Sequence, residues 1–331
     1  MTGVQTCALP ILTKSNIKVL ENALIDHVDA YTAPRLVEYH DPDPCRPPPP
    51  QMVATGSVFM QRMAAPASPV DRTKALGVTI EAEYTVGEYD ILILSATQSD
   101  GLATWLNQEG YKTPQAAAPV LGSYIRQGMK FFVAKVNLKE QKKLGHQYLR
   151  PISVAYETEK FMLPVRLGTV NANGPQDMLV FMLTPKGRVE ATNYRTQRIP
   201  SNLNVPIFTK GEFGDFYKAM FDEQVRKDGM RAVYTEYAWN MGWCDPCAAD
   251  PIPNDKLAQL GVTWLSAPSN GAPGRVIAPP PGGGSPVYIT RLHVRYDARS
   301  FPEDIMFQEG SEAHTSELQS HSFISYAVFC L

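Results

Sequence analysis

The sequence has no long apolar run and almost no net charge. A helix that crosses a bilayer needs roughly 18 or more consecutive apolar residues, and the 331 residues contain no such run. The formal net charge is -2, from 31 basic and 33 acidic residues. Nucleic-acid binding needs a basic face that displaces counterions. We therefore expect no membrane span in this fragment and no nucleic-acid partner.

Several signatures of catalysis are also missing. No serine lies in a G-x-S-x-G context, and the glycine-rich stretches lack the phosphate-loop pattern. Glu38, His40, Asp41 and Asp43 are residue types that bind metals, but prolines interleave them without regular ligand spacing. The sequence thus indicates no coherent catalytic set and no cofactor, and it favours a structural loop over a metal site at residues 38–45.

The two ends match translated sequencing adapter. Residues 1–11, MTGVQTCALPI, translate in frame from one common library adapter, and residues 310–331 correspond to the opposite one with a departure at Ala313. Removing these segments discards Cys7, Cys330, Glu312 and Glu317, which leaves 31 acidic against 31 basic residues. We therefore expect the natural part to be a nearly neutral fragment, truncated on both sides.

Periodicity divides the natural part into three regions. Residues 12–46 carry a helical pattern followed by a proline-rich loop, residues 47–76 form a flexible connection, and residues 77–309 form the main domain. Short turns join most successive strands, and β-α-β alternation is not sustained. This favours an α+β fold with an antiparallel or mixed sheet, helices packed on one face, and long Pro/Gly-rich loops.

Individual elements follow from spacing and turn residues. A hairpin is predicted around Gly87-Glu88, and Asp100 is expected to cap the helix that follows it. Asn254 or Asp255 is expected to cap another helix. The further helices are predicted at 16–30, 113–127 and 211–229. The further strands are predicted at 130–138, 150–158, 160–169, 177–184, 188–195 after a turn at 185–187, 230–239 and 287–297, the last being the final strand.

Three natural cysteines remain, Cys45, Cys244 and Cys247, of which the last two lie in the stretch WCDPC. Thiol oxidoreductases place such a pair at a helix N-terminus, which lowers the thiol pKa. Here Pro251 and Pro253 would stop that helix. A structural disulfide within the pair or to Cys45, reduced inert thiols, redox activity and a metal site all stay open.

Arg291, His293 and Arg295 alternate along the last predicted strand and share one face. Two guanidinium groups beside an imidazole can hold a carboxylate or phosphate. The alternative is a solvated sheet face whose arginines pair with neighbouring carboxylates. The anion-binding hypothesis requires side chains that converge on an open pocket and are not paired with Glu or Asp.

Long stretches resemble one family. Residues 31–45, 160–196, 236–251 and 290–309 are similar, in order, to the bacterial domain-of-unknown-function family number 2330. The resemblance implies an N-terminal export signal, missing here, and an opening β region with its own cysteine. It also implies that Cys45, Cys244 and Cys247 belong to a disulfide set of an exported protein. It implies no reaction.

These observations favour a non-enzymatic binding or structural domain. The resemblance and the cysteine pattern favour a location outside the cytoplasm, either in the periplasm, associated with the envelope, or secreted. An envelope protein is the candidate partner. A thiol-disulfide oxidoreductase that uses Cys244 and Cys247 is the first alternative. An anion-binding module around Arg291 and Arg295 is the second.

Overall fold

The computed structural model describes residues 13–37 and 76–310, apart from 115, 146–147, 159, 171, 202–203, 242–247 and 267–286. Cys45, Cys244 and Cys247 lie outside the described residues, as do the metal-capable side chains of 38–43 and both adapter-like ends. The predictions that concern these residues therefore stay predictions.

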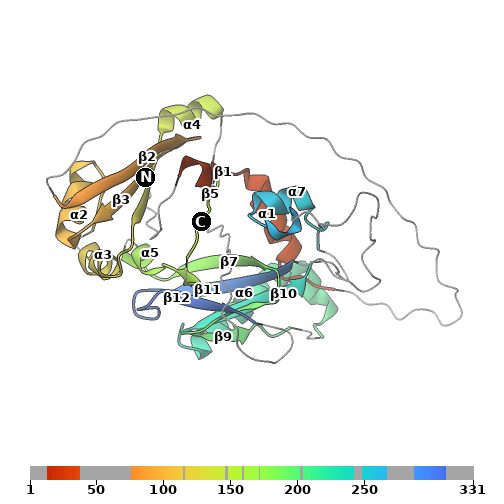
Figure 1. The fold of residues 1–331 in the computed structure, drawn as a ribbon. Coiled ribbons are helices and arrows are strands. Elements are labelled where there is room, and N and C mark those ends of the chain that lie inside the picture. Colours follow the sequence, from red (N-terminus) through yellow and green to blue (C-terminus); the bar gives the residue numbers. More distant parts are fainter. Residues whose placement is uncertain are drawn as a thin grey trace, which may run out of the picture.

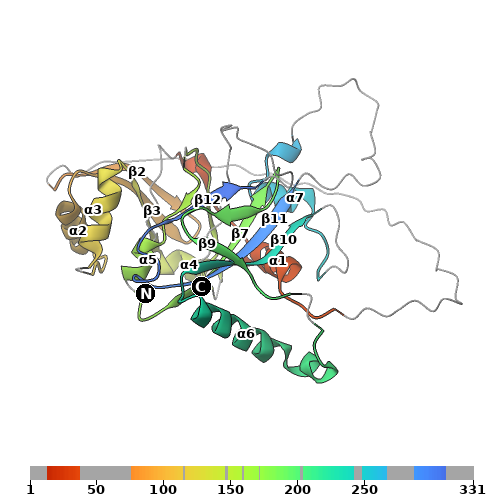
Figure 2. The ribbon, with the colours of Figure 1, turned by 90° about the horizontal axis from the view of Figure 1, so that it is seen from below.

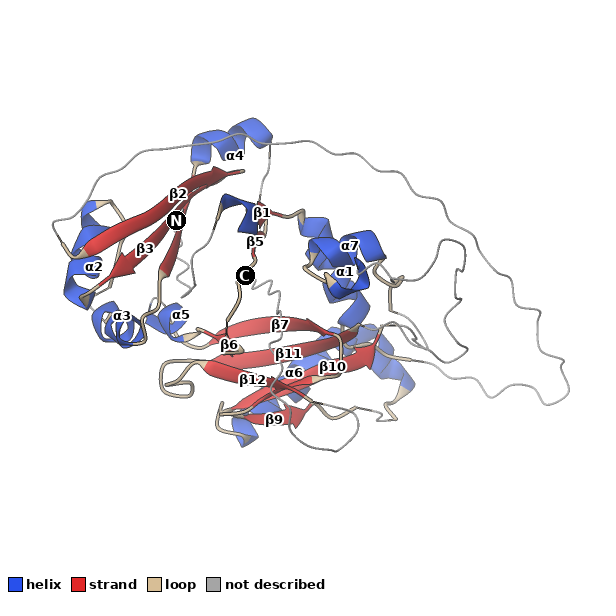
Figure 3. Cartoon of the chain, in the orientation of Figure 1, coloured by secondary structure: helices blue, strands red, loops and turns tan. Residues whose placement is uncertain are grey.

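The chain builds two units, each around its own sheet (Figures 1 and 3). The first unit has an antiparallel sheet in the order β2-β3-β4. A two-stranded pair, β1 with β5, lies against it. The elements of this unit are β1 (Ile17–Val19), β2 (Val78–Val86), β3 (Tyr89–Ala96), α2 (Ser99–Gln108), α3 (Ala117–Arg126), β4 (Phe131–Val136), α4 (Leu138–Leu144) and β5 (Ile152–Val154).

Strand β3 has a hydrophobic core on each face. Leu92 and Leu94 face α2 and α3, where Leu102, Trp105 and Leu121 are buried. Ile91 and Ile93 face the opposite way, toward the β1–β5 pair. Side chains alternate in direction along a strand, and this strand is apolar on both sides because both sides are covered.

The second unit has a mixed sheet in the order β7-β11-β10-β9, in which only the β9–β10 pair is parallel. A small antiparallel sheet, β6-β12-β8, covers one face. The elements of this unit are α1 (Asn22–Thr32), β6 (Met162–Leu163), β7 (Gln176–Thr184), β8 (Val189–Ala191), β9 (Arg195–Arg198), α6 (Phe213–Lys227), β10 (Ala232–Asn240), α7 (Asn254–Gln259), β11 (Tyr288–Tyr296) and β12 (Ile305–Glu309). Between β6 and β7, helix α5 (Arg166–Val170) packs against the first unit through Leu167 and Val170. Three short 3-10 helices complete the described chain: η1 (Lys14–Asn16), η2 (Ile207–Glu212) and η3 (Trp264–Ser266).

Strand β11 lies between β7 and β10 in the mixed sheet, and each face of the strand packs against a different core. Leu292 and Val294 point into the core shared with the small sheet. Ile289 points to the opposite face, where it packs with residues of α1 and α7. Helix α6 also lies on that face, and Figure 2 shows it outside the sheet. The α+β class with a mixed sheet is thus confirmed, and the charged alternation of β11 faces the helices.

Two sequence predictions about the extent of helices and strands need correction. Residues 16–30 were predicted as one helix, but Ile17–Val19 pairs as β1 with β5 before α1 begins. Residues 160–169 were predicted as a strand, but only Met162–Leu163 is extended and α5 follows. The reason is that the Asp304 carboxylate accepts the backbone N–H groups of Val165 and Arg166 at 3.1 and 3.3 Å. This non-local contact satisfies N–H groups where the helix begins.

The predicted caps and the last strand also differ. Asp100 lies in the first turn of α2, and Gln98 precedes that helix without a side-chain cap. Helix α7 begins after Pro253, so neither Asn254 nor Asp255 is its cap residue. Strand β12 follows β11 and closes the small sheet, so β11 is not the final strand.

Candidate functional site

Glu236 occupies a β-bulge in the centre of the charged face. Tyr234 pairs with His293 and Tyr237 pairs with Arg291, so the register shifts between them and one residue is extra. A bulge re-aims a side chain at such a point. Glu236 is turned toward α6, where its side chain is 1% exposed. It accepts hydrogen bonds from Arg291 Nε at 2.6 Å, from His293 Nδ1 at 2.7 Å and from the Tyr217 hydroxyl.

Arg291 joins the sheet to α1. Its side chain is 8% exposed, and Nη1 donates to Asp29 Oδ1 at 2.5 Å and to the Asp29 carbonyl at 3.2 Å. The same nitrogen lies 3.3 Å from Thr32 Oγ1. Because Nε bonds Glu236, two carboxylates from different elements hold one buried guanidinium. Such a fork locks the relative position of the elements that supply its partners.

His293 contacts α6 through its ring face. The ring stacks on Phe221 with centroids 3.8 Å apart and an interplanar angle of 7°. Nδ1 faces Glu236, while Nε2 lies 3.6 Å from Asp177 Oδ1. The imidazole therefore lies between two carboxylates, and the aromatic face of α6 covers it.

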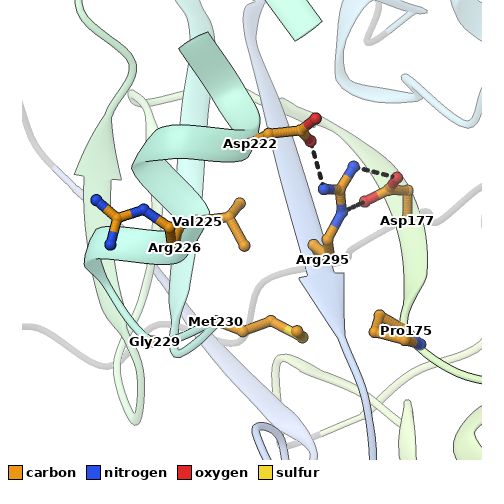
Figure 4. Close-up of a pocket in the computed structure, with 8 residues that line it drawn as sticks. All are labelled: Pro175, Asp177, Asp222, Val225, Arg226, Gly229, Met230 and Arg295. Atoms are coloured by element: carbon orange, nitrogen blue, oxygen red, sulfur yellow. Dashed lines mark hydrogen bonds and ion pairs between the residues drawn. The ribbon is translucent and has the colours of Figure 1, made fainter. Parts of the chain in front are cut away.

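Arg295 fastens α6 through Asp222, the residue that follows Phe221, as Figure 4 shows. Its Nε and Nη2 donate to the two oxygens of Asp177 at 2.7 and 2.8 Å, and Nη1 donates to Asp222 Oδ1 on α6 at 2.5 Å. Asp177, Asp222 and Arg295 line an open hollow with a volume of about 640 Å³. Pro175, Val225 and Met230 line it as well. The side chains of Asp177 and Asp222 are 47% and 45% exposed, so the hollow presents carboxylate oxygens.

The hydrogen bonds set the charge state of Glu236. Burial by itself raises the pKa of this carboxyl, but the bonds from His293 and Tyr217 and the charge of Arg291 outweigh it and hold the pKa below the ordinary value. Burial, together with the Glu236 charge and hydrogen bond, raises the pKa of Tyr217. The site therefore keeps an ionised carboxylate beside a neutral phenol under α6.

The arrangement does not meet the condition set for anion binding. Arg291, His293 and Arg295 do come together on one face, as the alternation indicated, but both guanidinium groups are paired with carboxylates. The contacts match the alternative, a sheet face whose arginines pair with neighbouring carboxylates. The face differs from that alternative at Arg291, which is buried and not solvated. An incoming carboxylate or phosphate would have to displace an acidic side chain from each arginine.

Sequence reasoning missed the acidic partners. Asp29, Asp177, Asp222 and Glu236 come from α1, β7, α6 and β10, and no local spacing links them. One signal pointed to Glu236. A buried arginine needs a carboxylate partner, and Glu236 is the acidic residue of the predicted strand 230–239. The bulge that aims it could not be read from the strand alternation.

Exposed apolar side chains lie in η2 and at the start of α6. Ile207 and Phe208, in η2 after Pro206, are 77% and 76% exposed, and Phe216 is 37% exposed. Phe213 lies beside Phe216 and Tyr217, with ring centroids 6.5 and 6.1 Å from its own. We call Ile207, Phe208, Phe213 and Phe216 the α6 ridge. In Figure 2, this end of α6 lies at the edge of the molecule.

Metal-binding groups and membrane-spanning helices are both absent from the described residues. Within the part of the chain that the structure describes, no three His, Cys, Asp or Glu side chains are grouped so that they could hold a metal ion. Among the same residues, no helix has the length and apolar character required to span a bilayer.

The depressed pKa of Glu236 predicts a pH effect. A carboxyl with a lowered folded pKa contributes stability above its unfolded pKa of about 4.3, and that contribution is lost as pH falls through the folded value. Glu88, buried beside Arg150, also has a lowered pKa, so acid lowers the stability of the wild type and of Glu236 variants alike through this residue. We expect urea denaturation at pH 7 to separate the wild type from Glu236→Gln, and the gap to narrow below about pH 4.

The control for this experiment is Glu157→Gln, at an exposed position. It should follow the wild type at every pH. A gap between the wild type and Glu236→Gln that stayed constant or widened in acid would contradict the assignment of an ionised, hydrogen-bonded Glu236.

The fold and the site define an α+β protein of two sheet units in which ion pairs fasten helices to a mixed sheet. The chain belongs to the family described as "Uncharacterized protein conserved in bacteria (DUF2330)", whose model matches residues 4–308. Neither a curated protein nor a solved structure matches the chain.

Proposed function

We propose that this chain is a non-enzymatic binding domain that works outside the cytoplasm, and that the α6 ridge is the surface with which it holds an envelope protein. The observation that carries the proposal is the exposure of Ile207 and Phe208, each more than three-quarters accessible. Both lie in η2, which leads directly into α6, and α6 is fastened to the sheet through Asp222. Adjacent large apolar side chains at a surface mark interaction sites.

The paired face supports a role in presentation. Tyr217, Phe221 and Asp222 of α6 contact Glu236, His293 and Arg295 of the sheet. These contacts leave the polar groups of the face bonded to one another and place α6 in one position. A rigid helix that presents aromatic side chains loses little conformational entropy when it binds. Aromatic residues are also enriched among those that dominate binding energy.

The export signal and the disulfide set implied by the family resemblance support the extracytoplasmic location. The partner is then an envelope protein with an apolar groove that accepts Ile207 and Phe208. The stretch WCDPC keeps the thiol-disulfide oxidoreductase as a second candidate. The discriminating observation is the Cys244 thiol: a pKa well below the free value of about 8.5, with turnover of a disulfide substrate, favours the oxidoreductase.

Photo-crosslinking tests the ridge. With benzoylphenylalanine in place of Phe208, we expect one dominant ultraviolet-dependent adduct in envelope fractions of a bacterium that carries a gene of this family. The same substitution at Lys227, exposed at the other end of α6, should give none. Adding Ile207→Ser should reduce the Phe208 adduct roughly tenfold, because truncating an apolar anchor commonly costs more than 1 kcal/mol of binding energy.

Two outcomes would count against the ridge as the binding surface. One is an adduct of equal yield at Phe208 and Lys227, which would indicate random contact. The other is an unchanged Phe208 adduct in the presence of Ile207→Ser, which would show that the apolar side chains do not hold the partner.

A further inference from the structure

Helix α4 forms without a core to cover. The Asn137 side chain accepts the backbone N–H groups of Lys139 and Glu140 at 3.2 and 3.3 Å, and Gly145 ends the helix with a φ of +71°. None of the seven residues of α4 is buried. Most helical stability in proteins comes from packing an apolar face, so the core does not explain the apolar residues here.

Large apolar side chains are concentrated around α4. Leu138 is 65% exposed and Leu144 is 46% exposed, while Tyr148 and Leu149 just beyond the helix are 76% and 49% exposed. These are four of the nine large apolar side chains that are exposed among the described residues. Single exposed apolar residues are ordinary, but a local group of them marks a binding surface.

Lysines are interleaved with this apolar group. Leu138, Lys139, Lys142 and Lys143 fall within an arc of about 140° on a helix with 3.6 residues per turn, and all four are exposed. Lys143 pairs with Glu140 at 2.6 Å. The helix therefore carries three positive charges against one negative charge, with a leucine among the lysines on the outward side.

We propose that the surface of an anionic lipid bilayer binds the α4 patch, which we define as Leu138, Leu144, Tyr148 and Leu149 together with Lys139, Lys142 and Lys143. Leucine and tyrosine side chains enter the boundary between headgroups and acyl chains. Lysine stems lie along apolar surface while their ammonium groups reach the phosphates. The patch offers both kinds of side chain on one exposed segment.

The chemistry favours a bilayer over an acidic macromolecule. Duplex nucleic acid or an acidic protein surface would pair with the lysines but leave four apolar side chains in water. A bilayer presents an anionic layer directly above an apolar one, so both halves of the patch are satisfied. Figure 1 shows α4 on the opposite side of the molecule from α6, so docking through α4 leaves the α6 ridge accessible. This inference goes beyond the proposed function and does not depend on it.

Vesicle co-sedimentation of the purified chain tests the proposal. We expect binding to vesicles of mixed phosphatidylglycerol and phosphatidylcholine, and much weaker binding to phosphatidylcholine alone. Lys139→Gln with Lys142→Gln should weaken binding about 30-fold, since each lysine near an anionic surface contributes roughly a fivefold gain. Leu138→Ser with Tyr148→Ser should weaken it about tenfold, because apolar area is no longer buried.

The matched control is Ile207→Ser with Phe208→Ser, which removes exposed apolar side chains from the α6 ridge. It should leave vesicle binding unchanged, so failure of the ridge and failure of the patch are distinguishable. Thermal unfolding of each variant checks that the fold is retained. Three results would overturn the proposal: no binding to anionic vesicles, equal binding to both lipid compositions, or patch-dependent binding to polyglutamate or duplex DNA without vesicle binding.

Discussion

Replacing Glu236 with alanine is expected to lower the free energy of unfolding by about 3–5 kcal/mol, the range for a buried charge left without its partner. The carboxylate is 1% exposed and accepts from Arg291, His293 and Tyr217. Removing it leaves a buried guanidinium with one carboxylate and the half-buried Tyr217 phenol without an acceptor. Urea denaturation followed by circular dichroism measures the loss.

Asp29→Asn is the matched control, because Asp29 binds the same guanidinium from an exposed position. Its side chain is 50% exposed, so solvent screens the pair and we expect a loss of about 1 kcal/mol or less. Amide hydrogen exchange adds a second readout, since Glu236→Ala should speed exchange in α6 before other helices. Equal losses for the two variants would show that burial of Glu236 does not matter.

Asp304→Ala is expected to have an effect of similar size, about 3–5 kcal/mol. Asp304 is 7% exposed and joins the two units. It accepts from the Tyr124 hydroxyl of α3 at 2.6 Å, from the Val165 and Arg166 backbone N–H groups, and from the Arg166 side chain at 2.9 and 3.1 Å. We expect α5 to lose its structure and the two units to unfold in separate transitions, as monitored by circular dichroism and tryptophan fluorescence.

Two further variants calibrate that result. Glu303→Ala changes the neighbouring exposed side chain and should alter stability by about 0.5 kcal/mol or less. Tyr124→Phe removes one hydrogen bond and should cost about 1–2 kcal/mol. If Asp304→Ala lost no more stability than Tyr124→Phe, the backbone contacts at α5 would contribute little, and the assignment of a non-local cap would be wrong.

Local signals in the sequence were sufficient where the structure is local. The β2–β3 hairpin was predicted correctly because Gly87 supplies a φ of +57° between two strands rich in β-branched and aromatic residues. Helix α6 was predicted from its apolar stripe and Gly229. The one-face grouping of Arg291, His293 and Arg295 was also correct, because strand β11 has no bulge opposite β7.

Helices α4 and α5 and the ion-paired site were not predicted. The causes are contacts between distant residues and, for α4, a helix-capping signal that was overlooked. Helix α5 depends on Asp304, far along the chain, so the segment alone was predicted as a strand. Helix α4 could have been found from Asn137 followed by Glu140 three residues later, a spacing typical of a helix start. The ion-paired site could not be predicted in full, because its carboxylates come from four elements and the bulge that aims Glu236 has no local signature.

The bulge in β10 also constrains how this strand can change. Tyr234 lies opposite His293 and Tyr237 lies opposite Arg291, so even-numbered side chains face the helices before the extra residue and odd-numbered ones face them after it. Deleting one residue from this stretch would restore a regular pleat and send one half of the strand to the wrong layer. Among related chains, we therefore expect length variation to fall in the connecting loops, while the residue count between Tyr234 and Tyr237 is kept.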